Sequence, residues 1–187
     1  MESVTIFQIV AFILASIAIA ALSWRSLGNP GCHGFYRFFA FEAILIIIVL
    51  NIPFWIKEAF SPAQIASWFL LIFSIVFAVQ GIYWLRKAGG SAQRADSPET
   101  FAFENTTNLV TKGIYNYIRH PLYSSLLLLA WGAYLKHITT AGALAAIVAT
   151  AALIITAKMD ERECLDIFGS AYAAYMKQSK MFIPYLF

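Results

Sequence analysis

Two short groups of ionisable residues stand out in an otherwise apolar chain: Arg119-His120-Pro121 and, further along, Asp160-Glu161. Proline is favoured in the first turn of a helix, because its missing N–H needs no partner there. A helix that begins at Pro121 presents free N–H groups and the positive end of its dipole. Together with Arg119 and His120, these groups can hold an anion such as a carboxylate. The alternative is that both cations are ordinary flanking charges of a membrane helix.

The residues after position 157 show a helical period. One face collects residues at steps of four or three: Glu161, Leu165, Phe168, Tyr172 and Tyr175. This pattern predicts an amphipathic helix within the C-terminal segment 158–187. Glu161 heads the apolar face, whereas Asp160 is rotated about 100° away from it. A carboxylate beside a buried face needs a cationic partner. Glu161 therefore either faces a cationic ligand or an arginine, or reaches out to the membrane surface.

The composition places these residues in a membrane protein. The chain of 187 residues is 60% hydrophobic and 12% charged, whereas a soluble domain is about half apolar and about a quarter charged. We therefore expect one integral membrane domain over 1–187. The net charge of +3 is explained by helix-flanking residues and does not indicate nucleic-acid binding. There is no glycine-rich dinucleotide loop. Cys32-His33 lacks a second ligand pair, so no metal site is predicted.

Five apolar blocks predict five transmembrane helices, over 4–22, 38–56, 62–85, 121–135 and 138–157. The fourth block is short of the roughly 17–25 residues that a span needs. It either extends back through 114–120 or forms one arm of a tight hairpin with the fifth. The first block could instead be a signal peptide, but no Lys or Arg precedes it and it is long for that role, which favours a span.

The distribution of basic residues predicts the orientation. The first loop, the third loop and the tail carry 11 of the 13 Lys and Arg residues, so these segments are expected in the cytoplasm and the N-terminus outside. The predicted fold is all-α: spans within 1–85, a cytoplasmic loop over 86–120, a helical hairpin over 121–157 and a cytoplasmic helix and tail over 158–187. Glu42 lies inside the second block and is either functional, paired with Arg37 or oriented toward the surface.

Two segments carry a family resemblance: "LVTKGIYNYIRHPLY" at 109–123 and "DERECLDIFGSAYAAYMKQSKMFIP" at 160–184. They resemble the isoprenylcysteine carboxyl methyltransferase and phospholipid methyltransferase superfamily of integral membrane enzymes. The matching positions are Leu109, Val110, Gly113, Tyr115, Arg119, His120, Pro121, Tyr123, Asp160, Glu161, Phe168, Gly169, Tyr172, Tyr175 and Pro184. They lie in the C-terminal half of the chain, whereas the first three spans match only in hydropathy.

The resemblance implies a methyltransferase that uses S-adenosylmethionine and acts on a lipophilic substrate at the cytoplasmic membrane face. The substrate would be a prenylcysteine carboxylate, a phospholipid amine or a similar molecule. The cofactor would lie against the 86–120 loop, closed over by the C-terminal helix. The implied cofactor contacts are Asn108, Leu109, Val110, Tyr115, His120, Ser125, Asp160 and Glu161, and the implied catalytic residues are Glu161 and Arg119.

The residues fit the chemistry of that cofactor. Arg119, His120 and the helix N-terminus suit its carboxylate, an acidic residue suits its ammonium, and Tyr115 suits its adenine and its sulfonium. The chain departs from the superfamily at three positions. Asp160 stands where Glu is usual and Ser125 where Gly is common. Thr156 occupies the position of an arginine that serves the substrate carboxylate in the prenylcysteine enzymes.

Two other functional classes stay open at this point. Sterol reductases share the C-terminal architecture, so a membrane reductase that uses NADPH is one alternative. A non-catalytic membrane scaffold is the other, although the intact Arg119, His120 and Glu161 argue against it. The sequence leaves open the substrate's nucleophile, the oligomeric state and whether Glu161 acts as a base.

Overall fold

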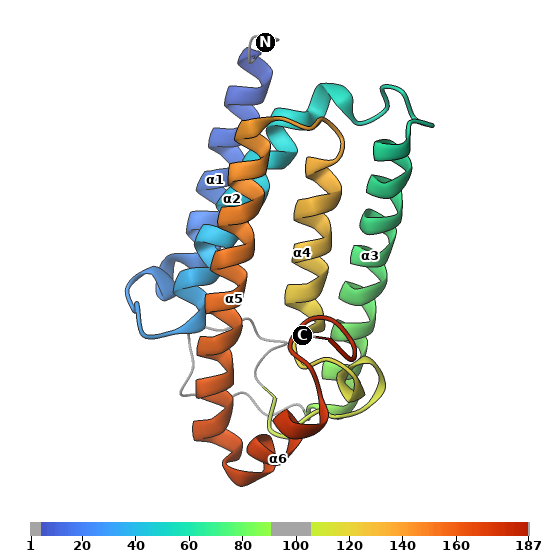
Figure 1. Ribbon diagram of the computed structural model, residues 1–187. Helices are drawn as coiled ribbons and strands as arrows, with labels where there is room; N and C mark the ends of the chain where they lie inside the picture. The colour runs from blue at the N-terminus through green and yellow to red at the C-terminus, as the bar shows by residue number, and fades with distance from the viewer. Residues whose placement is uncertain (1–4, 91–105, 187) are drawn as a thin grey trace.

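The computed structural model describes residues 5–90 and 106–186. The helices are α1 (Ile6–Leu27), α2 (His33–Asn51), α3 (Pro62–Ala88), α4 (Pro121–Tyr134), α5 (Thr140–Phe168) and α6 (Ser170–Gln178), as Figure 1 shows. Two 3₁₀ turns, η1 (Ile52–Phe54) and η2 (Gly113–Asn116), lie between them. The described residues contain no β-strand, which confirms the prediction of an all-α protein.

The helix starts follow from local capping chemistry. Thr5 and Gln8 form a capping box at the start of α1, and Ser61 and Thr139 accept backbone N–H groups at the starts of α3 and α5. Such caps satisfy N–H groups that lack a partner within the helix. Pro121 opens α4, as its position in the sequence predicted.

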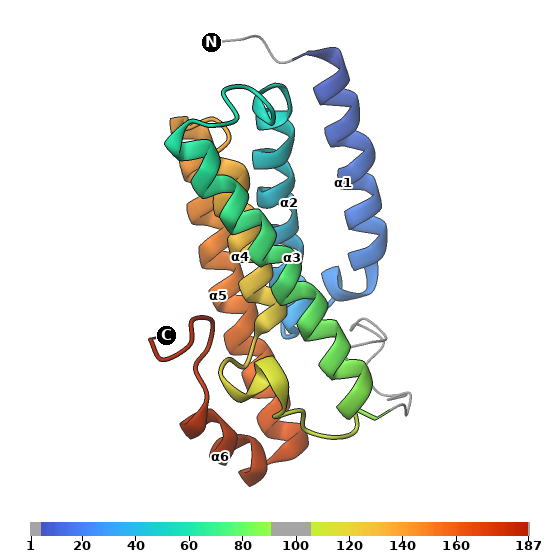
Figure 2. The same cartoon turned by 90° about the vertical axis from the view of Figure 1, so that its right-hand side faces the viewer.

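The long helices pack as a bundle around small side chains. The most extensive contacts join α2 to α5 and α3 to α4, whereas α1 packs against α2 at the edge of the bundle (Figure 2). The centre contains buried small residues that allow close approach of the backbones: Ala43, Ala130, Ala133, Ala146 and Ala149, packed around Ile44 and Ile47.

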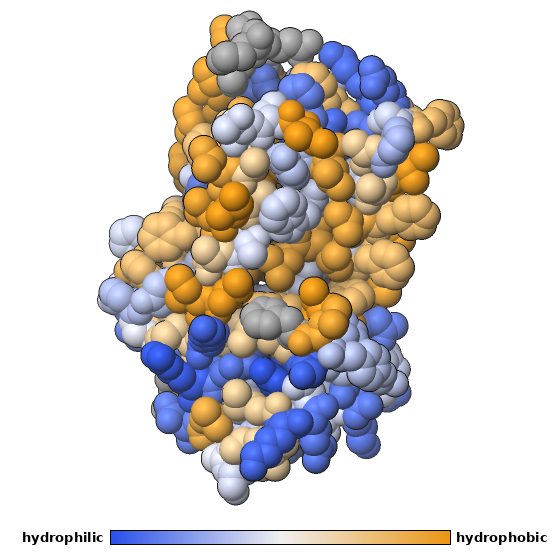
Figure 3. All heavy atoms as spheres, viewed as in Figure 1, coloured by the Kyte–Doolittle hydropathy of each residue, from blue (hydrophilic) through white to orange (hydrophobic). Residues whose placement is uncertain are grey.

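Four segments are long and apolar enough to cross a membrane: Ile6–Leu27, His33–Phe54, Pro62–Ala88 and Thr140–Phe168. The helix α4 has 14 residues and is therefore about 21 Å long, less than the roughly 30 Å of a bilayer core. The predicted count of five spans is not confirmed, and the orientation stays a prediction. Figure 3 shows an apolar band over the bundle and a polar end around α6.

The fifth span and the C-terminal helix are one helix, contrary to the predicted boundary between 157 and 158. Residues 158–168 contain no glycine or proline, so α5 continues to Phe168. It ends at Gly169, whose φ of 54° is unfavourable for other residues. The single helical face predicted from Glu161 to Tyr175 is therefore wrong, because Tyr172 and Tyr175 lie on α6.

Two other boundaries differ from the predicted spans. The helix α1 continues to Leu27, beyond position 22, and α2 begins at His33, before position 38. Helices extend past the apolar blocks because backbone hydrogen bonding does not stop where the hydrophobic run ends. Between these helices Ser16 Oγ donates a hydrogen bond of 2.9 Å to Glu42 Oε2, so the partner of Glu42 comes from α1.

Candidate active site

The residues around Arg119 and His120 are held by the returning C-terminal tail. The Arg119 N–H donates to the carbonyl of Lys180 at 2.7 Å, and the His120 N–H donates to that of Met181 at 3.2 Å. In the opposite sense, the Lys180 N–H donates to the Tyr117 carbonyl at 3.0 Å. The two extended segments thus satisfy backbone groups that precede α4, and they bring distant parts of the chain to one place.

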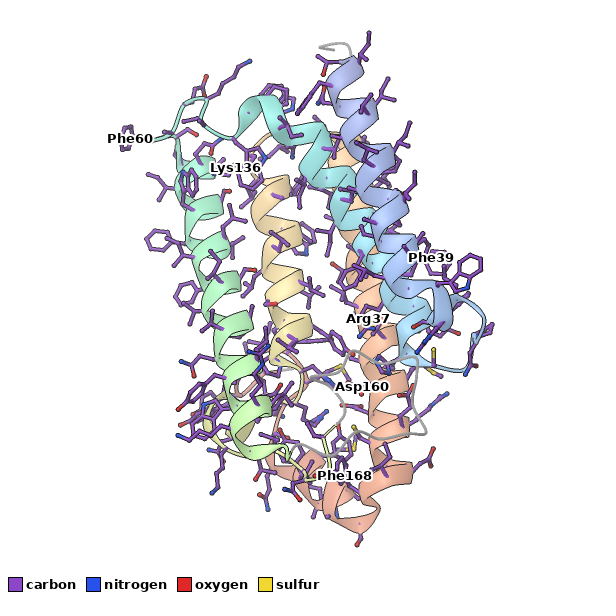
Figure 4. All side chains as sticks on the ribbon, turned by 180° about the vertical axis from the view of Figure 1, so that it is seen from behind. Arg37, Phe39, Phe60, Lys136, Asp160 and Phe168 are labelled. Carbon is purple, nitrogen blue, oxygen red and sulfur yellow. The ribbon has the colours of Figure 1, made fainter. Side chains whose placement is uncertain are left out.

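His120 lies between two adjacent carboxylates of α5. Its Nδ1 lies 3.4 Å from Asp160 Oδ2, and its Nε2 lies 3.3 Å from Glu161 Oε1. Consecutive residues point about 100° apart on a helix, and the two nitrogens on opposite sides of one imidazole ring match that divergence. Figure 4 shows Asp160 on α5, at the same end of the bundle as Phe168.

The two carboxylates determine the charge of His120. Burial by itself disfavours the charged imidazolium, but the hydrogen bonds and charges of Asp160 and Glu161 outweigh it. As a result, the pKa of His120 is raised above its usual value of 6.5. A protonated His120 offers an N–H on each side of the ring, one to each carboxylate.

Arg119 connects Glu161 to the end of α6. Its Nε donates to Glu161 Oε1 at 2.7 Å, and both side chains are 10% exposed. Its Nη1 donates to the Met176 carbonyl at 3.2 Å and also to the Ser179 carbonyl. Charge-assisted hydrogen bonds of Arg119 therefore link α5 to α6 and to the residue that follows α6.

Further contacts close α6 and the tail over the same region. The hydroxyl of Tyr175 donates to the Tyr115 carbonyl at 2.5 Å, and Ser124 Oγ lies 3.0 Å from the His120 carbonyl and 2.9 Å from the Phe182 carbonyl. The ring of Phe182 lies 6.1 Å from the ring of His120. The tail thus packs against His120 and the start of α4.

A cavity of about 110 Å³ lies under this cover. It is lined by Leu85, Thr106, Leu109, Val110, Tyr115, Arg119, His120, Pro121, Leu122, Tyr123, Asp160, Cys164, Phe168, Tyr172 and Tyr175. A second cavity of about 230 Å³ adjoins it and shares Leu109 and Tyr175. Tyrosine rings beside a carboxylate form a surface that attracts a cationic ligand.

An apolar groove of about 650 Å³ has Phe182 in its lining. It runs between α3, α4, α5 and the tail, and its lining includes Phe77, Leu128, Ile154 and Pro184. Ser124 and Phe182, which contact the backbone or ring of His120, also line this groove. Its inner end therefore lies next to the candidate site.

Most of the predicted site residues come together. Leu109, Val110, Tyr115, Arg119, His120 and Asp160 line the cavity, and Glu161 lies behind it, bonded to Arg119. Asn108 is exposed, with its N–H bonded to the Gly89 carbonyl, and it is outside the lining. Ser125 is also outside the lining. Its Oγ donates to the Leu122 carbonyl of α4 at 2.6 Å, and its carbonyl accepts from Ser74 Oγ of α3 at 2.7 Å.

Several residues of the site were not predicted. Cys164 and Phe168 line the cavity with Asp160, and the three recur at steps of four, so a search for the helical face of Asp160 would have found them. His33, which the sequence did not connect with this region, donates its N–H to Glu163 Oε1 at 2.7 Å. Its Nδ1 lies 2.7 Å from the other oxygen of Glu163.

His33, Glu163 and Asp160 place potential metal-binding atoms within 4.8 Å of one another. His33 and Glu163 meet because Glu163 caps α2. The N–H of His33, at the start of α2, donates to the Glu163 carboxylate of α5. The helix dipole favours an anion at that end of α2. No local sequence signal relates positions 33 and 163, so their meeting follows from the packing of α2 on α5.

A sequence model of the family described as phospholipid methyltransferase matches residues 62–171, more than half of the chain. The chain belongs to this family. The matched range contains Arg119, His120, Asp160 and Glu161. The match confirms the superfamily resemblance inferred from the two sequence segments.

Curated relatives of the family match shorter segments. A methanethiol S-methyltransferase 1 of Bradyrhizobium diazoefficiens is 33% identical over 73 residues, which are 38% of this chain and 25% of that protein. A methanethiol S-methyltransferase of a Pseudomonas strain is 30% identical over 93 residues, 50% of this chain and 33% of that protein. A methanethiol S-methyltransferase 2 of B. diazoefficiens is 26% identical over 162 residues, 77% of this chain and 58% of that protein. The matches thus span less than two thirds of each of these relatives, and no solved structure matches the chain.

Proposed function

We propose that this family member transfers a methyl group from S-adenosylmethionine to the thiol or amine of a lipophilic acceptor at the cytoplasmic membrane face. The acceptor loses its proton to solvent, because the sulfur or nitrogen must present a free electron pair. The observation that carries the proposal is the carboxylate of Asp160 in the wall of a cavity lined by Tyr115, Tyr172 and Tyr175. Bound S-adenosylmethionine supplies an electrophilic methyl group on a positively charged sulfur. Membership of a methyltransferase family supports methyl transfer. The basic residues at the end of the bundle that holds the cavity support the cytoplasmic face.

The donor groups of the cavity suit that cofactor. Asp160 would hold its ammonium, the tyrosine rings would face its adenine and sulfonium, and Leu109 and Val110 would pack against its apolar surface. The volume of about 110 Å³ is smaller than the roughly 300–1,000 Å³ of ligand sites. We therefore expect α6 to move outward on binding, which would join this cavity to its neighbour at Tyr175.

Arg119, in the cavity wall, and Glu161, behind it, would position other groups rather than react. Glu161 Oε1 accepts from Arg119 and also contacts His120, so we assign it no role as a proton acceptor. The Arg119–Glu161 pair would hold α6 against α5 and exclude water from the cavity. Exclusion of water and alignment of the reacting atoms are the main sources of rate enhancement for a simple group transfer.

The position of Thr156 argues against a carboxylate as acceptor. Thr156 is fully buried, and its hydroxyl donates to the Ala152 carbonyl of its own helix at 2.8 Å. It therefore provides no cation where the prenylcysteine enzymes are expected to have an arginine. A negatively charged acceptor buried without a cation is unfavourable. The relatives named for methanethiol support a sulfur nucleophile, and the family description supports a phospholipid amine.

The apolar groove would receive the hydrocarbon part of the acceptor. It opens between helices that face the membrane, and its inner end at Ser124 and Phe182 adjoins His120. An acyl or prenyl chain in this groove would place its polar end near the cavity. The proposed route is lateral, from the bilayer, so the acceptor does not need to leave the membrane.

Binding of S-adenosylmethionine to detergent-purified protein, measured by calorimetry, tests the cofactor assignment. We expect Asp160→Asn to weaken binding by about tenfold or more, as for loss of one charge-assisted contact. Asp166→Asn is the matched control, because Asp166 is an exposed carboxylate on the same helix.

NADPH is tested in parallel. Binding of NADPH alone would reassign the protein to the reductases, and binding of neither molecule in the presence of lipid would contradict the proposal.

Transfer of a radiolabelled methyl group tests the acceptor class. Three acceptors with the same long hydrocarbon chain are compared, ending in a thiol, an amine or a carboxylate. We expect labelling of the thiol or the amine and none of the carboxylate. Labelling of the carboxylate alone would overturn the argument from Thr156, even if S-adenosylmethionine binds as proposed.

A further inference from the structure

A buried lysine lies at the end of the bundle opposite the candidate site. Figure 4 shows Lys136 at the same end as Phe60, away from Asp160. Lys136 follows α4 and is 4% exposed. Its Nζ donates to Gln64 Oε1 at 3.0 Å and lies 3.4 Å from the centre of the Trp68 ring.

These contacts do not neutralise the charge of Lys136. Within residues 5–90 and 106–186, the contacts of its ammonium group are with the neutral Gln64 amide and with the rings of Trp55 and Trp68. No carboxylate in that part of the chain forms an ion pair with it. A buried charge is normally balanced by an opposite charge, because burial removes the solvation that water provides. An anionic ligand would supply that balance.

A cavity of about 440 Å³ has both Lys136 and its hydrogen-bond partner Gln64 in its lining, and we refer to it as the Lys136 pocket. It is lined by Phe54, Lys57, Glu58, Ser61, Ala63, Gln64, Leu135, Lys136, His137 and Ile138. Two lysines and one histidine thus surround it, and Glu58, which is exposed, is its one acidic lining residue.

The first turn of α3 adds a further positive contribution. Ser61, Ala63 and Gln64 in the lining belong to the capped N-terminus of this 27-residue helix. The N–H of Ala63 is in the first turn and has no acceptor within the helix. A long helix carries a partial positive charge at this end, which favours anions, and phosphate groups in particular.

We propose that the Lys136 pocket binds the phosphate group of a membrane lipid. Lysine, a helix N-terminus and a histidine are typical donors to phosphate oxygens. Ile56 and Phe60 beside the pocket are 82% and 90% exposed, and exposed apolar side chains near Trp55 and Trp68 are typical of the membrane interface. At that depth the phosphates of lipid headgroups are the most abundant anions. A free phosphate ion has the same binding chemistry and is the other source.

Lipid binding at this pocket is independent of the proposed methyl transfer. The two regions lie at opposite ends of the bundle (Figure 4), and they share no lining residue. A variant of Lys136 is therefore expected to leave the affinity for S-adenosylmethionine unchanged. Failure of one proposal would not affect the other.

Native mass spectrometry of the full chain in an uncharged detergent measures lipid occupancy directly. Phosphatidylglycerol is titrated against wild type and against Lys136→Met, which keeps the length of the side chain and removes its charge. We expect the variant to bind this lipid about tenfold more weakly or worse. Lys87→Met is the matched control, because Lys87 also lies over aromatic rings, those of Tyr83 and Trp84, but is exposed.

Two variants of exposed residues keep the test decisive if Lys136→Met does not fold. Glu58→Gln removes the negative charge from the rim and should strengthen binding of phosphatidylglycerol, whereas Lys57→Gln should weaken it. Equal binding by wild type, Glu58→Gln and Lys57→Gln would overturn the proposal, whether or not Lys136→Met folds.

A parallel titration with inorganic phosphate, at constant ionic strength, identifies the source of the anion. Thermal stabilisation by phosphatidylglycerol, absent with inorganic phosphate, would support a lipid site. Stabilisation by inorganic phosphate alone, lost in Lys136→Met, would overturn the lipid assignment and leave a site for the free ion.

Discussion

Arg119 donates from its Nε to Glu161 Oε1 at 2.7 Å, with both side chains 10% exposed. The pair joins the residue before the α4 N-cap to α5. The hydrogen bonds of Arg119 to the carbonyls of Met176, in α6, and Ser179, just after it, extend the connection to the tail. Burial makes such a pair asymmetric: its formation contributes little net stability, but loss of one partner leaves a charge without compensation.

Glu161→Gln should therefore lower the free energy of unfolding by about 3–5 kcal/mol, since Arg119 would remain buried and charged. The measurement is reversible unfolding in mixed detergent micelles. In a separate comparison, the double variant Arg119→Met, Glu161→Leu should lose less unfolding free energy than Arg119→Met and Glu161→Leu lose in sum when each is made alone. Additive costs would show that the two side chains do not interact in the folded state.

The raised pKa of His120 predicts how stability depends on pH. The folded protein holds the proton of His120 more tightly than the unfolded chain does, because Asp160 and Glu161 face the ring. Protonated His120 therefore contributes to the free energy of unfolding. This contribution is fully present below 6.5, the pKa of the histidine in the unfolded chain, and is lost as pH rises through the higher pKa of His120 in the folded protein.

Unfolding measured from about pH 6 to about pH 9 should show this decline, and His120→Asn should flatten it. His137→Gln, at an exposed histidine away from the site, is measured in parallel. A slope that persists in His120→Asn would assign the pH dependence to another group.

Tyr175→Phe should loosen α6 without a change in its packing volume. The substitution removes the hydroxyl that donates to the Tyr115 carbonyl, at an expected cost of about 0.5–1.5 kcal/mol for the loss of one hydrogen bond. Hydrogen exchange in residues 170–182 should become faster. The exposed Tyr185 is the control, and Tyr185→Phe should leave the exchange rates unchanged.

Gly169→Ala tests the backbone at the junction of α5 and α6. A Cβ there would meet no atom within 4 Å, but φ is +54° and ψ is −130°. The expected loss, about 1–3 kcal/mol of stability, would therefore arise from backbone strain alone. Gly28→Ala is the matched helix-end control, because Gly28 has a φ of −76° and ordinary space for a Cβ. An equal effect at both positions would contradict this account.

Much of the fold follows from local patterns. The apolar blocks predicted the long helices, and Pro121 marked the start of α4, because both signals act within a few residues of one helix. The end of α5 was missed because the apolar block ends near position 157, whereas the backbone hydrogen bonds continue until Gly169 permits a turn. The short α4, in contrast, agrees with its apolar block over 121–135, which is itself shorter than a span needs.

The residues of the candidate site were identified by type, but their arrangement depends on how the helices pack. Asp160 and Glu161 point in different directions on α5, and no periodic pattern indicates that His120 lies between them. Nor does any pattern pair His33 with Glu163, or Arg119 with the end of α6. Helical periodicity relates residues within about two turns, whereas these contacts bridge distant segments. They form because packing of α2 on α5, and return of the tail along 117–120, bury charges that must then find partners.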